Sequence, residues 1–156
     1  MIYKILKMSF ILFFLFFSQT AYTHDYYLGK LTIDHPYMVA PMPGSKMSSG
    51  YLKIINKGAK SDYLMGAESL FSQNIEIHEM IMANNVMKMR KLPNGLEIPG
   101  GKETNLEPGG YHIMFKNLNK KLMIGGKEKV LLIFRDTGKI IVTFEIKKMG
   151  HKVSDH

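Results

Sequence analysis

The sequence has 156 residues, of which 46% are hydrophobic, and this length and composition fit one compact domain rather than two. It contains no cysteine, so thiolate metal sites and disulfides are excluded. The formal net charge is +8, but the lysines are scattered and do not cluster with aromatic residues, which argues against a nucleic-acid-binding surface.

Residues 1–23 are expected to be a secretory signal peptide. Two lysines precede the apolar run Met8–Phe17, and small or polar residues follow it, which is the pattern of such a leader. The run is shorter than the roughly 20 apolar residues of a membrane-spanning helix. Cleavage after Ala21 or Thr23 would release the chain into the periplasm and, by removing two lysines, lower the net charge from +8 to +6. The alternative is an uncleaved membrane anchor.

The rest of the chain predicts an all-β fold without helices. From Leu31 onward, short alternating or β-branched runs are separated by Gly, Pro and Asn, which is typical of strands and turns. The expected strands are Leu31–His35, Ser49–Asn56, Asp62–Glu68, Asn74–Met82, Val86–Leu92, Thr104–Leu106, Gly110–Asn117, Lys129–Arg135 and Lys139–Lys148. They predict a single Greek-key β-sandwich, cupredoxin-like or immunoglobulin-like, over residues 24–148, followed by a polar tail at 149–156.

Two hairpins join neighbouring strands in this prediction. Their turns are expected at Ala83–Asn85 and at Asp136–Gly138. The first turn would make His78 and Met89 near-facing partners across the hairpin. The second hairpin is expected to supply core residues, namely Leu131, Ile133, Ile141 and Phe144.

The segment Tyr37–Ser49 is rich in Pro, Gly and Ser and is expected to be a loop. It carries Met38, Met42 and Met47. Two interpretations of these methionines stay open: spare thioethers near a metal site, or soft hydrophobic side chains that cover one end of the sandwich.

Two His-x-Met pairs flank a methionine doublet in the middle of the chain. The first pair is His78 and Met80, the second is His112 and Met114, and between them lie Met87 and Met89. On β-strands the period of two places the members of each pair side by side on one face. The opposite face is then expected to be core, with Ile75, Ile77, Tyr111, Ile113 and Phe115.

Imidazole nitrogen and thioether sulfur are uncharged, soft ligands, and together they favour Cu(I) over zinc, calcium or magnesium. A thioether has no proton to lose and forms no disulfide, so such a site keeps working in an oxidising compartment. A Cu(I) site outside the cytoplasm is therefore chemically sensible.

These motifs resemble the periplasmic copper chaperones of the PCuAC type. That family's signature is His, ten residues, Met, about twenty-one residues and then His-x-Met. Here His78 is followed by ten residues, Met89, twenty-two residues and His112-Ile113-Met114. The flanking words VMKMR, LEIPGG and LEPGGYHIM are also similar, and residues 35–56 read like the family's opening segment. The second spacer is one residue longer, which the turn Leu92–Gly95 is expected to absorb.

The resemblance implies which side chains hold the metal ion. His78, Met89, His112 and Met114 match the family's ligand positions. Met80 shares the face of His78 and is a secondary candidate. The two remaining methionines of this region, Met82 and Met87, are expected to be packing residues.

The resemblance also implies a function. The chain is expected to be a periplasmic metallochaperone that delivers Cu(I) to the cytochrome c oxidase assembly route, in particular to the dinuclear copper centre. Its partner would be an apo copper protein or an oxidase assembly factor. We expect a monomer without enzymatic activity or a nucleic-acid partner, whose positive charge allows peripheral membrane proximity. The alternatives are a periplasmic copper buffering or tolerance protein and a metal-free secreted β-sandwich binding module.

Overall fold

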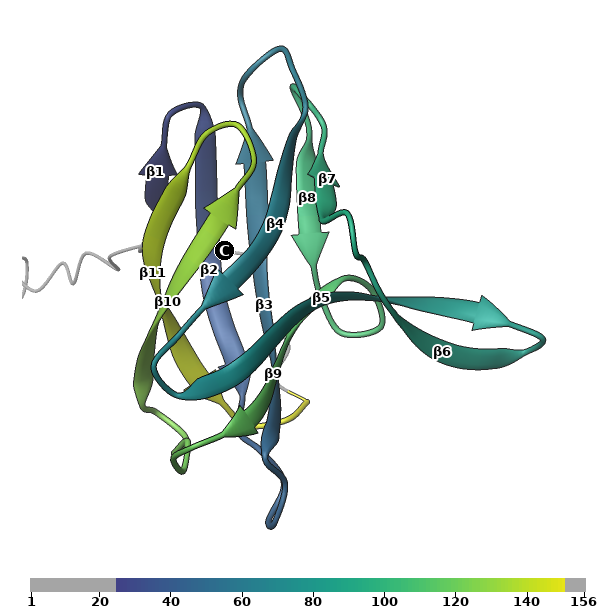
Figure 1. Cartoon of the computed structure of the whole chain (residues 1–156), viewed down its shortest axis with the longest axis vertical. Helices are drawn as coiled ribbons and strands as arrows, with labels where there is room; N and C mark the ends of the chain where they lie inside the picture. Colours follow the sequence, from purple (N-terminus) through teal and green to yellow (C-terminus); the bar gives the residue numbers. More distant parts are fainter. Residues whose placement is uncertain (1–24, 151–156) are drawn as a thin grey trace, which may run out of the picture.

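The computed structural model describes residues 25–150, which form eleven strands and no helix (Figure 1). The predicted signal peptide at 1–23, position 24 and residues 151–156 of the expected tail lie outside the described residues. None of the described residues forms a helix that could span a membrane. The strands are β1 (Tyr26–Leu28), β2 (Leu31–Val39), β3 (Met47–Asn56), β4 (Asp62–Glu68), β5 (Ser72–Ala83), β6 (Val86–Lys91), β7 (Leu96–Ile98), β8 (Glu103–Leu106), β9 (His112–Leu118), β10 (Lys127–Phe134) and β11 (Lys139–Lys147).

A single hydrogen-bonded path joins most of these strands, in the order β6-β5-β9-β3-β2-β11-β10-β4-β7, while β1 pairs with β2 and β8 pairs with β3. The pair β2–β11 is parallel and the others are antiparallel. The path curls on itself (Figure 1). Buried side chains from both of its halves form one core. The predicted all-β sandwich is confirmed.

The last hairpin, β10–β11, shows how strongly the choice of face depends on register. Its buried side chains are Val130, Leu132, Phe134, Val142, Phe144 and Ile146. The expectation that Leu131, Ile133 and Ile141 supply core is wrong, because these positions lie on the other face of the same two strands. A shift of one residue exchanges the two faces of a strand completely.

β2 extends further than the sequence predicts and shortens the loop that follows it. The strand continues through Pro36 to Val39, with a register shift between Asp34 and Tyr37 and a positive φ of 47° at His35. Met38 is consequently a fully buried core residue rather than part of a loop. This excludes the metal-ligand interpretation for Met38.

The second half of β5 leaves the sandwich and forms a two-stranded arm with β6, which projects on the right in Figure 1. Asn84 and Asn85 make the turn at its tip, with φ angles of 52° and 60°. Two consecutive positive φ values characterise the type I′ turn, whose twist suits a hairpin and which favours asparagine. We call the hairpin of residues 78–91 the arm.

Candidate metal site at the base of the arm

Two histidines that are distant in the sequence face each other where the arm leaves the sandwich. β5 pairs with β9 from Ser72 to His78 and with β6 from His78 to Ala83, so His78 is the residue at which β5 changes partner. His112, the first residue of β9, is the register partner of His78. The ring centroids lie 5.6 Å apart, with the planes at 73°. Directly opposite residues of an antiparallel pair share a face, so both imidazoles lie on the same side of the sheet.

Each imidazole has one ring nitrogen in a hydrogen bond and one without a partner. His78 Nε2 lies 2.9 Å from Glu76 Oε2, and His112 Nδ1 lies 3.2 Å from the carbonyl oxygen of Gly110. An ionised carboxylate and a carbonyl only accept, so these two nitrogens carry the protons. His78 Nδ1 and His112 Nε2 are buried and have no hydrogen-bond partner among residues 25–150. Both keep a lone pair for a ligand, as in metal-binding histidines whose other nitrogen is held by a second group.

Glu76 is the carboxylate that orients His78. Hydrogen bonds from Lys116, at 2.7 Å, and from His78 lower the pKa of Glu76 to about 2. Burial acts in the opposite direction, and a hydrogen bond from Lys91 lowers the pKa further. Glu76 is also the register partner of Met114, which places it on the ligand face. No role for Glu76 is predicted from the sequence, although its position two residues before His78 on the same strand face is the signal that could have identified it.

His112 is the more enclosed of the two histidines. It is 3% exposed, and its ring centroid lies 6.4 Å from that of Tyr51. Burial lowers the pKa of His112, and the nearby charge of His78 lowers it further. The hydrogen bond to Gly110 acts in the opposite direction but is outweighed, so the pKa is lower than its ordinary value. The ring is therefore neutral at neutral pH, which is the form that binds metal ions.

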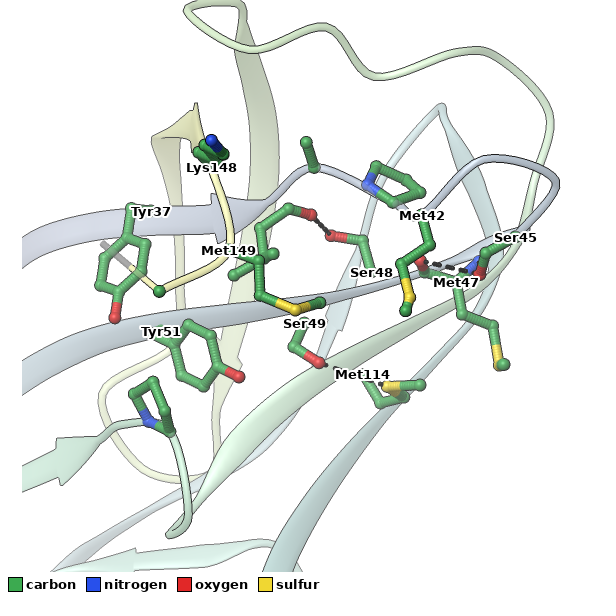
Figure 2. A pocket seen from close by; sticks show the side chains of 15 residues that line it. Tyr37, Met42, Ser45, Met47, Ser48, Ser49, Tyr51, Met114, Lys148 and Met149 are labelled. Carbon is green, nitrogen blue, oxygen red and sulfur yellow. Dashed lines mark hydrogen bonds between the residues drawn. The ribbon is translucent and has the colours of Figure 1, made fainter. Parts of the chain in front are cut away.

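Met114 lies on the same face as the two histidines. Its register partners are Glu76 on β5 and Ser49 on β3, and Ser49 Oγ donates a hydrogen bond to its sulfur at 3.7 Å. Met114 borders a hollow with a volume of about 440 Å³. Figure 2 shows it there together with Met42, Met47 and Met149. The sulfur of Met114 is therefore reached from this hollow.

Met89 is placed differently from the prediction. In the register of β5 and β6, Met89 lies opposite Met80, and His78 lies opposite Lys91. The expectation that His78 and Met89 nearly face each other is therefore wrong. The reason is that the turn contains two residues instead of three, which moves the centre of the hairpin by half a residue. Met89 stays on the face of His78 as a diagonal neighbour, within the reach of a long flexible side chain.

The remaining expectations for this region have mixed outcomes. Ile77, Ile113 and Phe115 are buried as predicted, whereas Tyr111 is exposed and is not a core residue. Met82 and Met87 do not pack into the core either. They are 65% and 46% exposed, because they lie on the part of the arm that extends beyond the sandwich.

The donors that gather at the base of the arm are soft. In the part of the chain that the structure describes, no group of three or more His, Cys, Asp or Glu side chains is placed to hold a metal ion. Two imidazoles with free nitrogens share a face with the thioethers of Met80, Met89 and Met114. This set suits a soft ion better than zinc or calcium. The four-ligand set His78, Met89, His112 and Met114 stays a prediction.

Comparisons with known proteins agree with this fold. Residues 31–146 match the family described as "Putative lipoprotein LpqE-like". The chain is 32% identical over 104 residues to the protein Lxx21020 of Leifsonia xyli subsp. xyli, a match that covers 67% of this chain and 63% of that protein. The chain thus spans less than two thirds of the length of this relative.

Two solved structures share the architecture. The apo PCuAC domain from PmoF1 superposes with a TM-score of 0.69 at 26% identity, covering 80% of this chain and 99% of that domain. The Cu(I) form of DR1885 from Deinococcus radiodurans superposes with a TM-score of 0.61 at 22% identity, covering 85% of this chain and 87% of that one. Because the family match spans most of the described residues, the chain belongs to the LpqE-like family and is of the PCuAC type.

Proposed function

We propose that the protein is a Cu(I) carrier whose ion is held by His78, His112, Met114 and Met89. The observation that carries this proposal is the pair of buried imidazole nitrogens without hydrogen-bond partners, each on a ring whose other nitrogen is held. A buried polar atom without a partner costs stability, and a bound ion would offset that cost. In support, one solved structure of this fold is a copper-bound PCuAC domain and another is Cu(I)-DR1885.

Neutral ligands make the site suitable for transfer of the ion to a recipient. Two imidazoles and two thioethers carry no charge, so a recipient with anionic thiolates binds Cu(I) more tightly and the ion moves downhill to it. His112 is deeply buried, whereas Met89 is 49% exposed. An incoming ligand would therefore replace Met89 first and the histidines last, with Met80 opposite Met89 as an alternate thioether.

The proposed setting is the periplasm, after cleavage of the leader at residues 1–23. The recipient would be the dinuclear copper centre of cytochrome c oxidase or one of its assembly factors. The protein would act as a monomer without enzymatic turnover, and its basic charge would favour acidic partners and peripheral contact with the membrane. Copper buffering is the second candidate function, because the same ligands would serve both.

Anaerobic Cu(I) titration with X-ray absorption spectroscopy tests the site. We expect one tightly bound equivalent with mixed nitrogen and sulfur scattering. The double substitution His78→Ala with His112→Ala should abolish it, while His35→Ala, which changes an exposed histidine on β2, should not. Nitrogen-only scattering, a preference for zinc, or unchanged binding in the double variant would contradict the proposal. The absence of any Cu(I) binding would contradict it as well and would favour a metal-free binding module.

Deletion of the protein separates delivery from buffering. Loss of copper from cytochrome c oxidase at low copper supply is expected if the protein delivers the ion. Sensitivity only at high copper, with a fully loaded oxidase, would instead support buffering. Complementation with the double histidine variant serves as the control, because it removes the ligands from an otherwise complete chain.

A further inference from the structure

The arm carries four methionines on one face. Met80 lies directly opposite Met89, and Met82 lies directly opposite Met87. Directly opposite side chains of an antiparallel pair share a face, with Cβ atoms about 5 Å apart. Residues two apart on a strand also share a face, about 7 Å apart. The two cross-strand pairs therefore form one continuous patch of four thioethers, which we call the methionine ladder.

The two faces of the arm differ in chemistry. The face opposite the ladder is mixed: Glu79 accepts a hydrogen bond from Arg90 Nε at 2.8 Å, Ile81 lies opposite Lys88, and both residues of the last pair, Ala83 and Val86, are apolar. On the ladder face, all four positions of the outer part of the arm are methionines. The first charged residue on this face is Lys91, at the base of the arm. Four methionines on one face are not needed for solubility, since a two-stranded arm exposed to solvent can be polar on both faces.

Burial does not account for the outer pair of the ladder. Met82 and Met87 are 65% and 46% exposed, so their side chains gain little from the hydrophobic effect. Each side chain ends in a soft sulfur on a flexible stem, and two sulfurs that start about 5 Å apart at Cβ can converge on one ion. Uncharged sulfur ligands select Cu(I) rather than Zn(II), Ca(II) or Mg(II).

The ladder is continuous with the histidine site. Met80 follows His78 by two residues on the same face, and Met82 follows Met80 in the same way. Starting at the turn, the ladder face therefore presents the Met82–Met87 pair, then the Met80–Met89 pair, and then His78 with His112. An ion that moves along this face meets ligands of increasing donor strength, from thioethers alone to imidazole nitrogen with thioether.

We propose that Met82 and Met87, with Met80, form a second and weaker Cu(I) site that contains only thioethers and admits the ion to the histidine site. This inference deepens the proposed function and rests on it, because it assumes Cu(I) as the cargo. Cu(I) enters at the tip of the arm, exchanges to the Met80–Met89 pair and is then held by the histidines. The ion keeps its oxidation state throughout, so no oxidant or reductant is involved.

Substitution by leucine distinguishes sulfur chemistry from an apolar contact. Leucine preserves the apolar volume and the strand pairing at these exposed positions but removes the sulfur. The test variant is the double substitution Met82→Leu with Met87→Leu in the whole chain. The matched control is Met65→Leu with Met123→Leu, which removes two exposed methionines from other parts of the fold.

Three measurements read out the result. In an anaerobic Cu(I) titration, the unmodified chain should bind a second, weaker equivalent with sulfur-only scattering, which the test variant loses and the control keeps. Transfer of Cu(I) from a chelator complex to the histidine site should be about 10-fold slower in the test variant alone, with its final affinity unchanged. Ag(I), added as a redox-inert substitute for Cu(I), should shift the methyl resonances of Met82 and Met87 once the first site is filled.

The outcomes separate the two proposals. If the first equivalent binds with nitrogen and sulfur scattering, but the test variant loads as fast as the control and no sulfur-only equivalent appears, only the ladder proposal is overturned. If the chain binds no Cu(I) through the histidines, the proposed function fails and the ladder proposal fails with it. If the ladder supports partner binding rather than Cu(I) loading, the leucine variant will load as fast as the unmodified chain. Neither protein will then bind a sulfur-only equivalent, and Ag(I) will leave the methyl resonances of Met82 and Met87 in the unmodified chain unshifted, which also overturns the proposal.

Discussion

His78 and His112 lie directly opposite each other on β5 and β9, with ring centroids 5.6 Å apart, although His112 is 3% exposed and the side chain of His78 keeps 12% of its surface exposed. The two histidines are therefore direct partners in the strand register but differ in their exposure to solvent. His112 contacts Tyr51 and has a lowered pKa, whereas His78 borders the solvent-exposed arm and is oriented by Glu76.

This asymmetry predicts different costs for the two alanine variants. Both substitutions should weaken Cu(I) binding by more than about 100-fold, because each removes a ligand. His112→Ala should also lower the free energy of unfolding by about 2 kcal/mol, since it leaves a cavity in a buried position. His78→Ala should cost less, about 1 kcal/mol, because its side chain lies nearer the surface and Glu76 keeps its ion pairs with Lys91 and Lys116. Chelator competition and urea denaturation measure the two effects, and equal losses of stability would contradict the prediction.

The thioethers of Met89 and Met80 face each other, so exchanging each in turn identifies the ligand. Met89→Leu should lower the sulfur coordination number by one and weaken Cu(I) binding, because Met89 matches the family's ligand position. Met80→Leu should leave the first equivalent unchanged. Both leucines preserve the cross-strand apolar contact, so each variant controls for the other. The reverse pattern, seen by X-ray absorption, would assign the ligand to Met80.

Glu76→Gln should weaken Cu(I) binding without unfolding the protein. The substitution removes the negative charge that holds His78 Nε2–H and pairs with Lys116. Loss of such an orienting carboxylate typically lowers metal affinity about 10- to 100-fold. Glu79→Gln is the matched control, because Glu79 lies on the opposite face and pairs with Arg90. Equal affinities of the two variants would show that Glu76 does not position the ligand.

Asp62, the first residue of β4, makes the free energy of unfolding depend on pH. Burial by itself would raise the pKa of Asp62, but hydrogen bonds from the Thr137 hydroxyl and from the amides of Asp136, Tyr63 and Thr137 outweigh it and lower the pKa below its ordinary value of 3.8. The folded state thus binds this proton more weakly than the unfolded chain does. The stabilisation is complete above pH 3.8 and is lost as the pH falls through the lower folded pKa.

Asp62→Asn should therefore destabilise the protein at pH 7 by about 1–3 kcal/mol and should matter less as the pH falls below 3.8. The physical reason is that a protonated carboxyl and an amide are both neutral and hold the turn of the β10–β11 hairpin similarly. Urea denaturation of both proteins at several pH values measures this difference. A difference that is independent of pH between 7 and 2 would contradict the assignment.

The sequence alone determined the all-β class, most strand positions and the residue types that gather at the candidate site. Alternation with a period of two was sufficient to place His78 with Met80 and His112 with Met114 on ligand faces, and Ile77 and Ile113 on core faces. The absence of cysteine was sufficient to direct the interpretation to soft neutral ligands. These properties are local, because they depend on residue type and on spacing within one strand.

Only the tertiary structure decided which strands are neighbours and in which register. The facing of His78 and His112 depends on the pairing of β5 with β9, and the pairing of Met80 with Met89 depends on a turn of two residues instead of three. The same applies to the core face of the last hairpin and to the burial of Met38 in an extended β2. Register is a relation between distant segments that packing selects, and a shift of one residue exchanges the faces, so a pattern within one strand does not specify it.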